Sequence, residues 1–96
     1  MTNRNIYGLT ERDMRTIEDI FQKYPDVTVV RLFGSRAKGN YKQGSDIDLA
    51  IMNEGVSVKV IGNLAFEFEE SSLPDMVDLI NYPTLNHKEF IEHIDN

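Results

Sequence analysis

The spacing of apolar and polar residues predicts a helix near the start of the chain. Thr10 is a good N-cap for it, and Asp13 stands where it can return the second bond of a capping box. The helix should end near Tyr24, because Pro25 follows and the residue before a proline avoids helical backbone angles. The apolar stripe of this helix consists of Met14, Ile17, Ile20 and Phe21.

Three further segments have the β-branched and apolar composition of strands. We expect these strands over residues 27–33, 46–52 and 76–82. In the first of them, Val29 and Val30 are adjacent and interrupt the alternation of apolar and polar residues. Such an interruption indicates a strand that is buried on both faces.

The remaining segments connect these strands. Residues 34–44 contain three glycines and are predicted to form a loop with one helical turn after Gly34. Residues 57–71 carry an apolar helical face, and a last short helix should begin after the N-cap Asn86. The order of these elements implies an α+β fold, a small mixed β-sheet with flanking helices, in a single domain over residues 1–96.

The chain is acidic overall but basic in one window. Sixteen acidic and ten basic residues give a net charge of −6, which argues against binding of duplex nucleic acid because phosphate neutralisation needs clustered Lys and Arg. Residues 27–45 nevertheless contain no acidic residue. A short basic loop on an acidic protein suits a small polyanion. The basic residues of this window are Arg31, Arg36, Lys38 and Lys42.

Composition also excludes several classes of protein. The chain contains no cysteine, so a disulfide scaffold, a thiolate metal site and thiol redox chemistry are excluded. No apolar run approaches the roughly 20 residues that span a bilayer, and the first residues lack the apolar stretch of a secretory signal. We therefore expect a cytoplasmic protein without a membrane partner.

The pair Gly34-Ser35 has the properties of a phosphate site. A strand that ends in Gly-Ser and turns directly into a helical turn presents free backbone N–H groups, and these suit a phosphate together with the serine hydroxyl. Gly34 lets the backbone approach a ligand closely, because it has no Cβ. On its own, however, a Gly-Ser pair is also common in ordinary turns.

Three aspartates indicate a metal site. Asp46 and Asp48 are two apart in a predicted strand, so their carboxylates should share one face. Two carboxylates this close repel unless a cation lies between them, and hard oxygen ligands beside phosphates indicate Mg²⁺. Asp78 lies in an apolar strand and can complete a two-metal site if that strand neighbours the second one. Asp75 is the rival candidate, but it follows Pro74 and is predicted to lie in an exposed turn.

These motifs carry a resemblance to a known family. The pattern Gly34-Ser35-x-Ala37-x-Gly39 followed by Ser45-Asp46-x-Asp48-Leu49 resembles the signature of the DNA polymerase β-type nucleotidyltransferase superfamily. The short length and the Gly-Ser-Arg-Ala-Lys-Gly form are most similar to its minimal nucleotidyltransferase (MNT) branch. The resemblance covers most of the chain and implies the polymerase β-like nucleotidyltransferase fold.

The resemblance also implies roles for the site residues. Asp46 and Asp48 would bind both of two Mg²⁺ ions, while Asp78 would bind one of them and help to activate the attacking hydroxyl. Gly34 and Ser35 would hold the β- and γ-phosphates of ATP. Additional contacts to the nucleotide phosphates are expected from Arg36, Lys38 and Ser45, although the two basic residues could also be solvated surface charges.

The function implied in this way is the transfer of AMP from ATP to a hydroxyl. Members of the MNT branch are often paired with a helical HEPN-type toxin, so the expected acceptor is a tyrosine on such a partner and the expected role is that of an antitoxin. A chain of 96 residues has little room for an acceptor pocket, which favours a second subunit. The alternatives are a non-catalytic antitoxin or binding subunit and a nucleotide-sensing module, and the three aspartates disfavour a purely occluding subunit.

Overall fold

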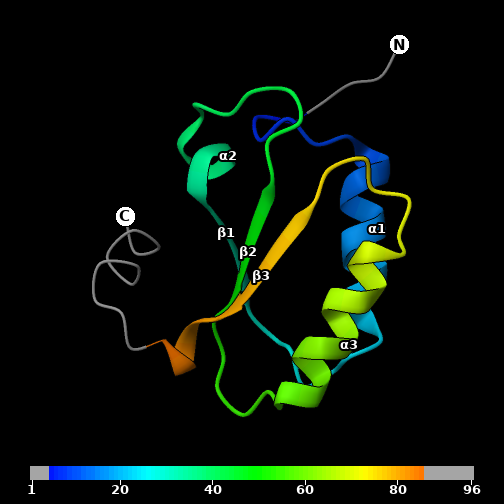
Figure 1. The fold of residues 1–96 in the computed structure, drawn as a ribbon, viewed down its shortest axis with the longest axis vertical. Helices are drawn as coiled ribbons and strands as arrows, with labels where there is room; N and C mark the ends of the chain where they lie inside the picture. Colours follow the sequence, from blue (N-terminus) through cyan, green and yellow to red (C-terminus); the bar gives the residue numbers. More distant parts are fainter. Residues whose placement is uncertain (1–4, 86–96) are drawn as a thin grey trace.

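The computed structural model describes residues 5–85 of the chain. Three α-helices, three strands and one 3₁₀ turn follow one another in the order that Figure 1 shows. They are α1 (Glu11–Gln22), β1 (Val30–Phe33), α2 (Gly34–Lys38), β2 (Ile47–Ile51), α3 (Val58–Glu69), β3 (Val77–Asn81) and η1 (Tyr82–Thr84).

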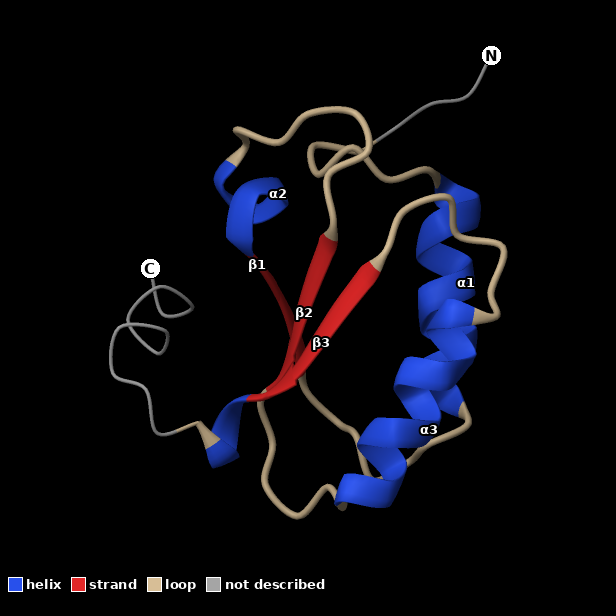
Figure 2. Ribbon diagram, in the orientation of Figure 1, coloured by secondary structure: helices blue, strands red, loops and turns tan. Residues whose placement is uncertain are grey.

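The three strands form one mixed sheet in the order β1-β2-β3. The hairpin-like pair β1 and β2 is antiparallel, whereas β2 and β3 are parallel and are connected by α3. This arrangement confirms the predicted mixed sheet with flanking helices. Figure 2 shows α1 and α3 side by side next to the sheet, with α2 at the end where β1 stops and β2 starts.

The main core lies between the sheet and these two helices. Ile47, Leu49 and Ile51 of β2 are buried in it, as are Leu64 and Phe68 of α3. The Phe68 ring packs against Phe21 of α1, edge to face, at 5.3 Å between centroids. Because side chains alternate along a strand, the residues between these three β2 residues point to the opposite face of the sheet.

The opposite face has a smaller apolar cluster. Phe33 and Ala50 are buried there, and Ile80, Tyr82 and Leu85 pack against them. Asp48 and Asp78 alternate with core residues of β2 and β3, so this face also carries the two carboxylates. The face away from α1 and α3 is therefore the one on which the predicted chemistry must be sought.

The first strand is shorter than predicted. It begins at Val30 because the Asn53 side chain takes the place of a ladder partner: its Oδ1 accepts hydrogen bonds from the N–H groups of Thr28 (3.0 Å) and Val29 (3.2 Å). The expected burial of this strand on both faces is wrong at Val29, which is 52% exposed. The apolar pattern of the strand does not indicate that a side chain so distant in sequence would accept hydrogen bonds from these N–H groups.

The other predicted elements differ only at their ends. The capping box of α1 is confirmed, since Thr10 Oγ1 accepts from the Asp13 N–H and Asp13 Oδ2 accepts from the Thr10 N–H, both at 3.0 Å. Ser57 caps α3 in a similar way. The helix predicted after Asn86 lies outside the described residues. No helix in the described part of the chain has the length and apolar character needed to cross a membrane.

Candidate active site

Two of the predicted metal ligands are register partners in the sheet. Asp48 of β2 stands directly opposite Asp78 of β3 in the parallel pair. Side chains at paired positions of neighbouring strands point to the same face, and neighbouring strands lie about 4.8 Å apart. Asp48 is partly buried and Asp78 is exposed. The condition set for Asp78, that the third strand neighbours the second, is therefore met, and the metal role of Asp78 remains a prediction.

The Gly34 backbone lies against the carboxylate of Asp48. Phe33, the residue before Gly34, is the register partner of Asp48 on the other side of β2. A Cβ built on Gly34 would overlap Asp48 Oδ2 and would lie 3.1 Å from Asp48 Cγ. Gly34 also has a φ of +73°, a backbone angle that favours glycine. Gly34 therefore makes room for a protein carboxylate, a reason that sequence reasoning had not supplied.

The turn that follows Gly34 has an N-cap residue whose side chain makes no capping bond. Phe33 is the N-cap of α2 and provides no side-chain hydrogen bond to the N–H groups of the first turn. At the other end, the Ser35 carbonyl accepts from the N–H groups of Gly39 (3.0 Å) and Asn40 (3.2 Å). Ser35 is partly buried and Lys38 is exposed. This geometry is compatible with the predicted phosphate contacts of Gly34, Ser35 and Lys38, which remain predictions.

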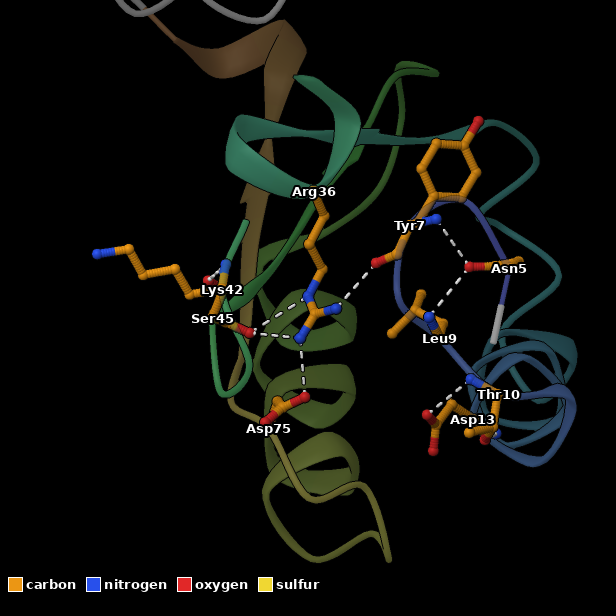
Figure 3. Close-up of polar contacts among 9 residues, drawn as sticks. All are labelled: Asn5, Tyr7, Leu9, Thr10, Asp13, Arg36, Lys42, Ser45 and Asp75. Carbon is orange, nitrogen blue, oxygen red and sulfur yellow. Dashed lines mark hydrogen bonds and ion pairs between the residues drawn. The ribbon is translucent and has the colours of Figure 1, made fainter. Parts of the chain in front are cut away.

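The structure places Arg36 elsewhere than predicted. Its side chain is only 2% exposed, and its guanidinium donates hydrogen bonds to the carbonyls of Tyr7 and Ser45 and to the carboxylate of Asp75 (Figure 3). All these acceptors belong to the protein, and burial of this kind turns the guanidinium away from a bound nucleotide. We therefore remove Arg36 from the predicted phosphate contacts.

The neighbours of Arg36 also correct the prediction for Asp75. Asp75 was expected in an exposed turn, but its side chain is 16% exposed and pairs with Arg36 at 2.8 Å. The Ser45 hydroxyl accepts from the Lys42 N–H at 2.9 Å and its carbonyl accepts from Arg36. Because a hydroxyl that accepts one bond can still donate another, the phosphate contact of Ser45 remains a prediction. Nothing in the sequence indicated the pairing of Arg36 with Asp75, because these residues come together only through the packing of separate loops.

The third predicted ligand, Asp46, directly precedes β2 instead of lying within it. It is exposed, and the next residue is fixed by a hydrogen bond from the Ile47 N–H to the Met76 carbonyl (2.8 Å). The donor chemistry of Asp46, Asp48 and Asp78 fits Mg²⁺, which prefers carboxylate oxygens. Within residues 5–85, however, no three His, Cys, Asp or Glu side chains are gathered as a completed metal site.

Similarity to known proteins identifies the family of the chain. Residues 15–96 match the family described as polymerase beta, nucleotidyltransferase. The chain belongs to this nucleotidyltransferase family. It is also 37% identical over 86 residues to a protein of Haemophilus influenzae named probable protein adenylyltransferase MntA, with 88% of this chain and 75% of that protein covered.

Membership of the polymerase beta nucleotidyltransferase family gives the class of reaction. The similarity to MntA agrees with the resemblance to minimal nucleotidyltransferases, and the mixed sheet with its helices is consistent with the family's fold. The chain is a nucleotidyltransferase, and a nucleotide is its substrate. The face that carries Asp48, Asp78 and the Gly34-Ser35 turn is the candidate site for this reaction.

Proposed function

We propose that the chain transfers AMP from ATP to a hydroxyl group of a partner protein in a reaction that requires Mg²⁺. The observation that carries this proposal is the pairing of Asp48 with Asp78 beside the Gly34-Ser35 turn. Two carboxylates and an uncapped turn at one edge of the sheet suit two metal ions and a triphosphate together. The relative named as a probable protein adenylyltransferase supports AMP and a protein as donor and acceptor.

Each residue of the site has a definite task in this proposal. Gly34 and Ser35 hold the β- and γ-phosphates through backbone N–H groups and the hydroxyl, and the exposed Lys38 adds positive charge. Asp46, Asp48 and Asp78 hold two Mg²⁺ ions. When bound, these ions neutralise charge on the attacking and leaving oxygens.

The transfer is a single displacement at the α-phosphorus. The acceptor oxygen forms a bond to this phosphorus while the bond to the bridging oxygen of the β-phosphate breaks, and pyrophosphate leaves. Asp78 is the exposed member of the carboxylate pair, so it is the one that an incoming hydroxyl can reach. We assign it the proton of that hydroxyl.

The acceptor that this proposal favours is a tyrosine of a HEPN-type helical protein, which the chain would neutralise as an antitoxin. The tyrosine, the HEPN-type partner and the antitoxin role rest on the resemblance to the MNT branch, whereas the name of the relative supports only a protein acceptor. It agrees with a carboxylate pair on a sheet face that α1 and α3 leave uncovered, since a protein side chain has to reach the α-phosphorus.

The test is incubation of the chain with Mg²⁺, ATP and a HEPN-type helical protein. Mass spectrometry of the partner should show one or more added adenylyl groups on tyrosine, with pyrophosphate released in equal amount. The Asp48→Asn variant should give neither product. An unmodified partner that is still neutralised by Asp46→Asn would support the non-catalytic antitoxin, and ATP binding without pyrophosphate release would support the nucleotide sensor.

A further inference from the structure

The buried Arg36 side chain connects three separate segments of the chain. Its Nε and Nη2 atoms both donate to the Ser45 carbonyl, at 3.2 and 2.8 Å. Nη2 also donates to Asp75 Oδ2 at 2.8 Å, and Nη1 donates to the Tyr7 carbonyl at 2.8 Å. The centroid of the Tyr41 ring lies 5.3 Å from the guanidinium carbon. Figure 3 shows the three residues that accept hydrogen bonds from the guanidinium, Tyr7, Ser45 and Asp75.

The positions of these neighbours in the sequence are informative. The Ser45 carbonyl belongs to the peptide group that joins Ser45 to Asp46, the first aspartate of the proposed metal site. Asp75 lies three residues before Asp78, on the loop that leads into β3. Arg36 itself belongs to α2, which begins at Gly34. A single side chain thus links the proposed phosphate turn to the segments that carry two of the three aspartates.

The contact between Arg36 and the Ser45 carbonyl fixes the orientation of a peptide group. Two nitrogens on one carbonyl restrict the tilt of the Ser45–Asp46 peptide group, because a planar guanidinium presents its donors in a rigid fork. Asp46 precedes β2, so the sheet holds only the peptide group on its C-terminal side, through the Ile47 N–H, while Arg36 holds the one on its N-terminal side. A buried arginine that lost these acceptors would leave unpaired donors at high cost, so the arrangement resists distortion.

We propose that Arg36 is a positioning residue that orients Asp46 for metal binding through the Ser45 carbonyl. The inference rests on the proposed function of Asp46 as a metal ligand. A positioning role for Arg36 predicts a different result from a phosphate contact. Loss of the guanidinium should weaken metal binding and slow transfer, while the affinity for the triphosphate should change little.

The first experiment needs no activity. Mn²⁺ binding is followed by electron paramagnetic resonance, and hydrogen exchange of the Ile47 amide is followed by NMR. In Arg36→Lys, Mn²⁺ affinity should fall about tenfold, as is usual for residues that orient metal ligands, and Ile47 should exchange faster. Asn53→Ala is the matched control, because Asn53 also clamps a loop by several hydrogen bonds, but at the opposite end of β2.

The second experiment uses transfer by the full chain with its partner. Arg36→Lys should lower kcat by about tenfold, with less than a twofold change in the KM for ATP, after correction for the folded fraction. Asp75→Asn keeps the arginine but removes the charge that holds Nη2 in place, so it should fold if Arg36→Lys does not. The guanidinium should then hold the Ser45 carbonyl less firmly, and kcat should fall about threefold in the same pattern.

The outcomes separate the possible roles of Arg36. Unchanged Mn²⁺ affinity in Arg36→Lys, or in Asp75→Asn if Arg36→Lys does not fold, would overturn the proposal. An increase in the KM for ATP without a change in kcat would overturn it as well and would restore the phosphate contact. If wild-type chain transfers no nucleotide, the proposed function fails, whereas the Mn²⁺ and exchange measurements still decide whether Arg36 orients Asp46.

Discussion

The carboxylate of Asp48 occupies the space that a side chain at Gly34 would need. A Cβ at position 34 would overlap Asp48 Oδ2. The proposed phosphate turn and the proposed metal site therefore meet at this contact. A change at one position should affect both halves of the site, a consequence that can be tested directly.

Replacement of Gly34 by alanine should damage the site more than the fold. The positive φ alone should cost about 1–2 kcal/mol of unfolding free energy, and the methyl group should also displace Asp48. We expect transfer to fall by about a hundredfold, the usual effect of a misplacement near 1 Å. Denaturant unfolding and kcat/KM would measure the two effects.

The matched control is Gly55→Ala. Gly55 has a φ of +88°, and a Cβ built there meets no atom within 4 Å, so this variant suffers the backbone cost alone. It should lose comparable stability and keep its transferase activity. Equal activities of the two variants would show that the contact between Gly34 and Asp48 is unimportant.

Replacement of either carboxylate of the Asp48–Asp78 pair should remove metal binding without a loss of stability. Asp48→Asn and Asp78→Asn should abolish transfer, and Mg²⁺ should no longer raise the melting temperature. Without metal, both variants should be as stable as wild type or slightly more so, because repulsion between paired carboxylates is relieved. Glu54→Gln, an exposed change beyond the far end of β2, is the control and should retain the Mg²⁺ effect. Full activity in either aspartate variant would refute the metal assignment.

The hydroxyl of Ser35 should matter for ATP and not for folding. Ser35→Ala should raise the Kd for Mg-ATP by about tenfold, the effect expected for one hydrogen bond to a charged group. Calorimetry would measure it. Ser57→Ala removes the N-cap of α3 and should instead cost about 1 kcal/mol of stability without a change in ATP affinity. The reverse result would place the phosphates away from α2.

An ion pair between the two helices predicts a pH dependence of stability. Hydrogen bonds from Lys23 and then from Tyr24 lower the pKa of the Glu67 carboxyl from its ordinary value. The carboxylate thus stabilises the native state at neutral pH, and this contribution is lost as the pH falls through the lowered pKa of Glu67. The same contact raises the pKa of Tyr24, whose contribution is lost as the pH rises through that value.

Glu67→Gln should accordingly be less stable than wild type at pH 7, with a difference that shrinks as the pH falls below the ordinary pKa of a glutamate and through the lowered pKa of Glu67. Unfolding midpoints in denaturant across that range would measure the difference. Glu69→Gln, an exposed change on the same helix, is the control and should follow wild type throughout. A constant gap between Glu67→Gln and wild type would show that the carboxylate charge plays no part.

Local features of the chain were readable from the order of its residues. The capping box of Thr10 and Asp13 joins residues three apart, and the alternation of Ile47, Asp48 and Leu49 assigns neighbours to opposite faces of a strand. Both depend on short-range geometry, which is a property of the backbone period. The nucleotidyltransferase motif was recognised for the same reason, since its glycine, serine and first aspartates lie close together in sequence.

Relationships between distant segments required the packed chain. The register that sets Asp48 opposite Asp78 depends on how far the α3 crossover carries the chain before β3 joins β2, and a shift of one residue would have turned Asp78 to the helical face. The burial of Arg36 depends on acceptors from loops 29 and 39 residues away along the chain. From the sequence alone, an arginine in a basic segment is readily taken for a ligand contact. Local sequence specifies the donor groups of such a side chain, but only the packed chain decides which distant atoms accept from them.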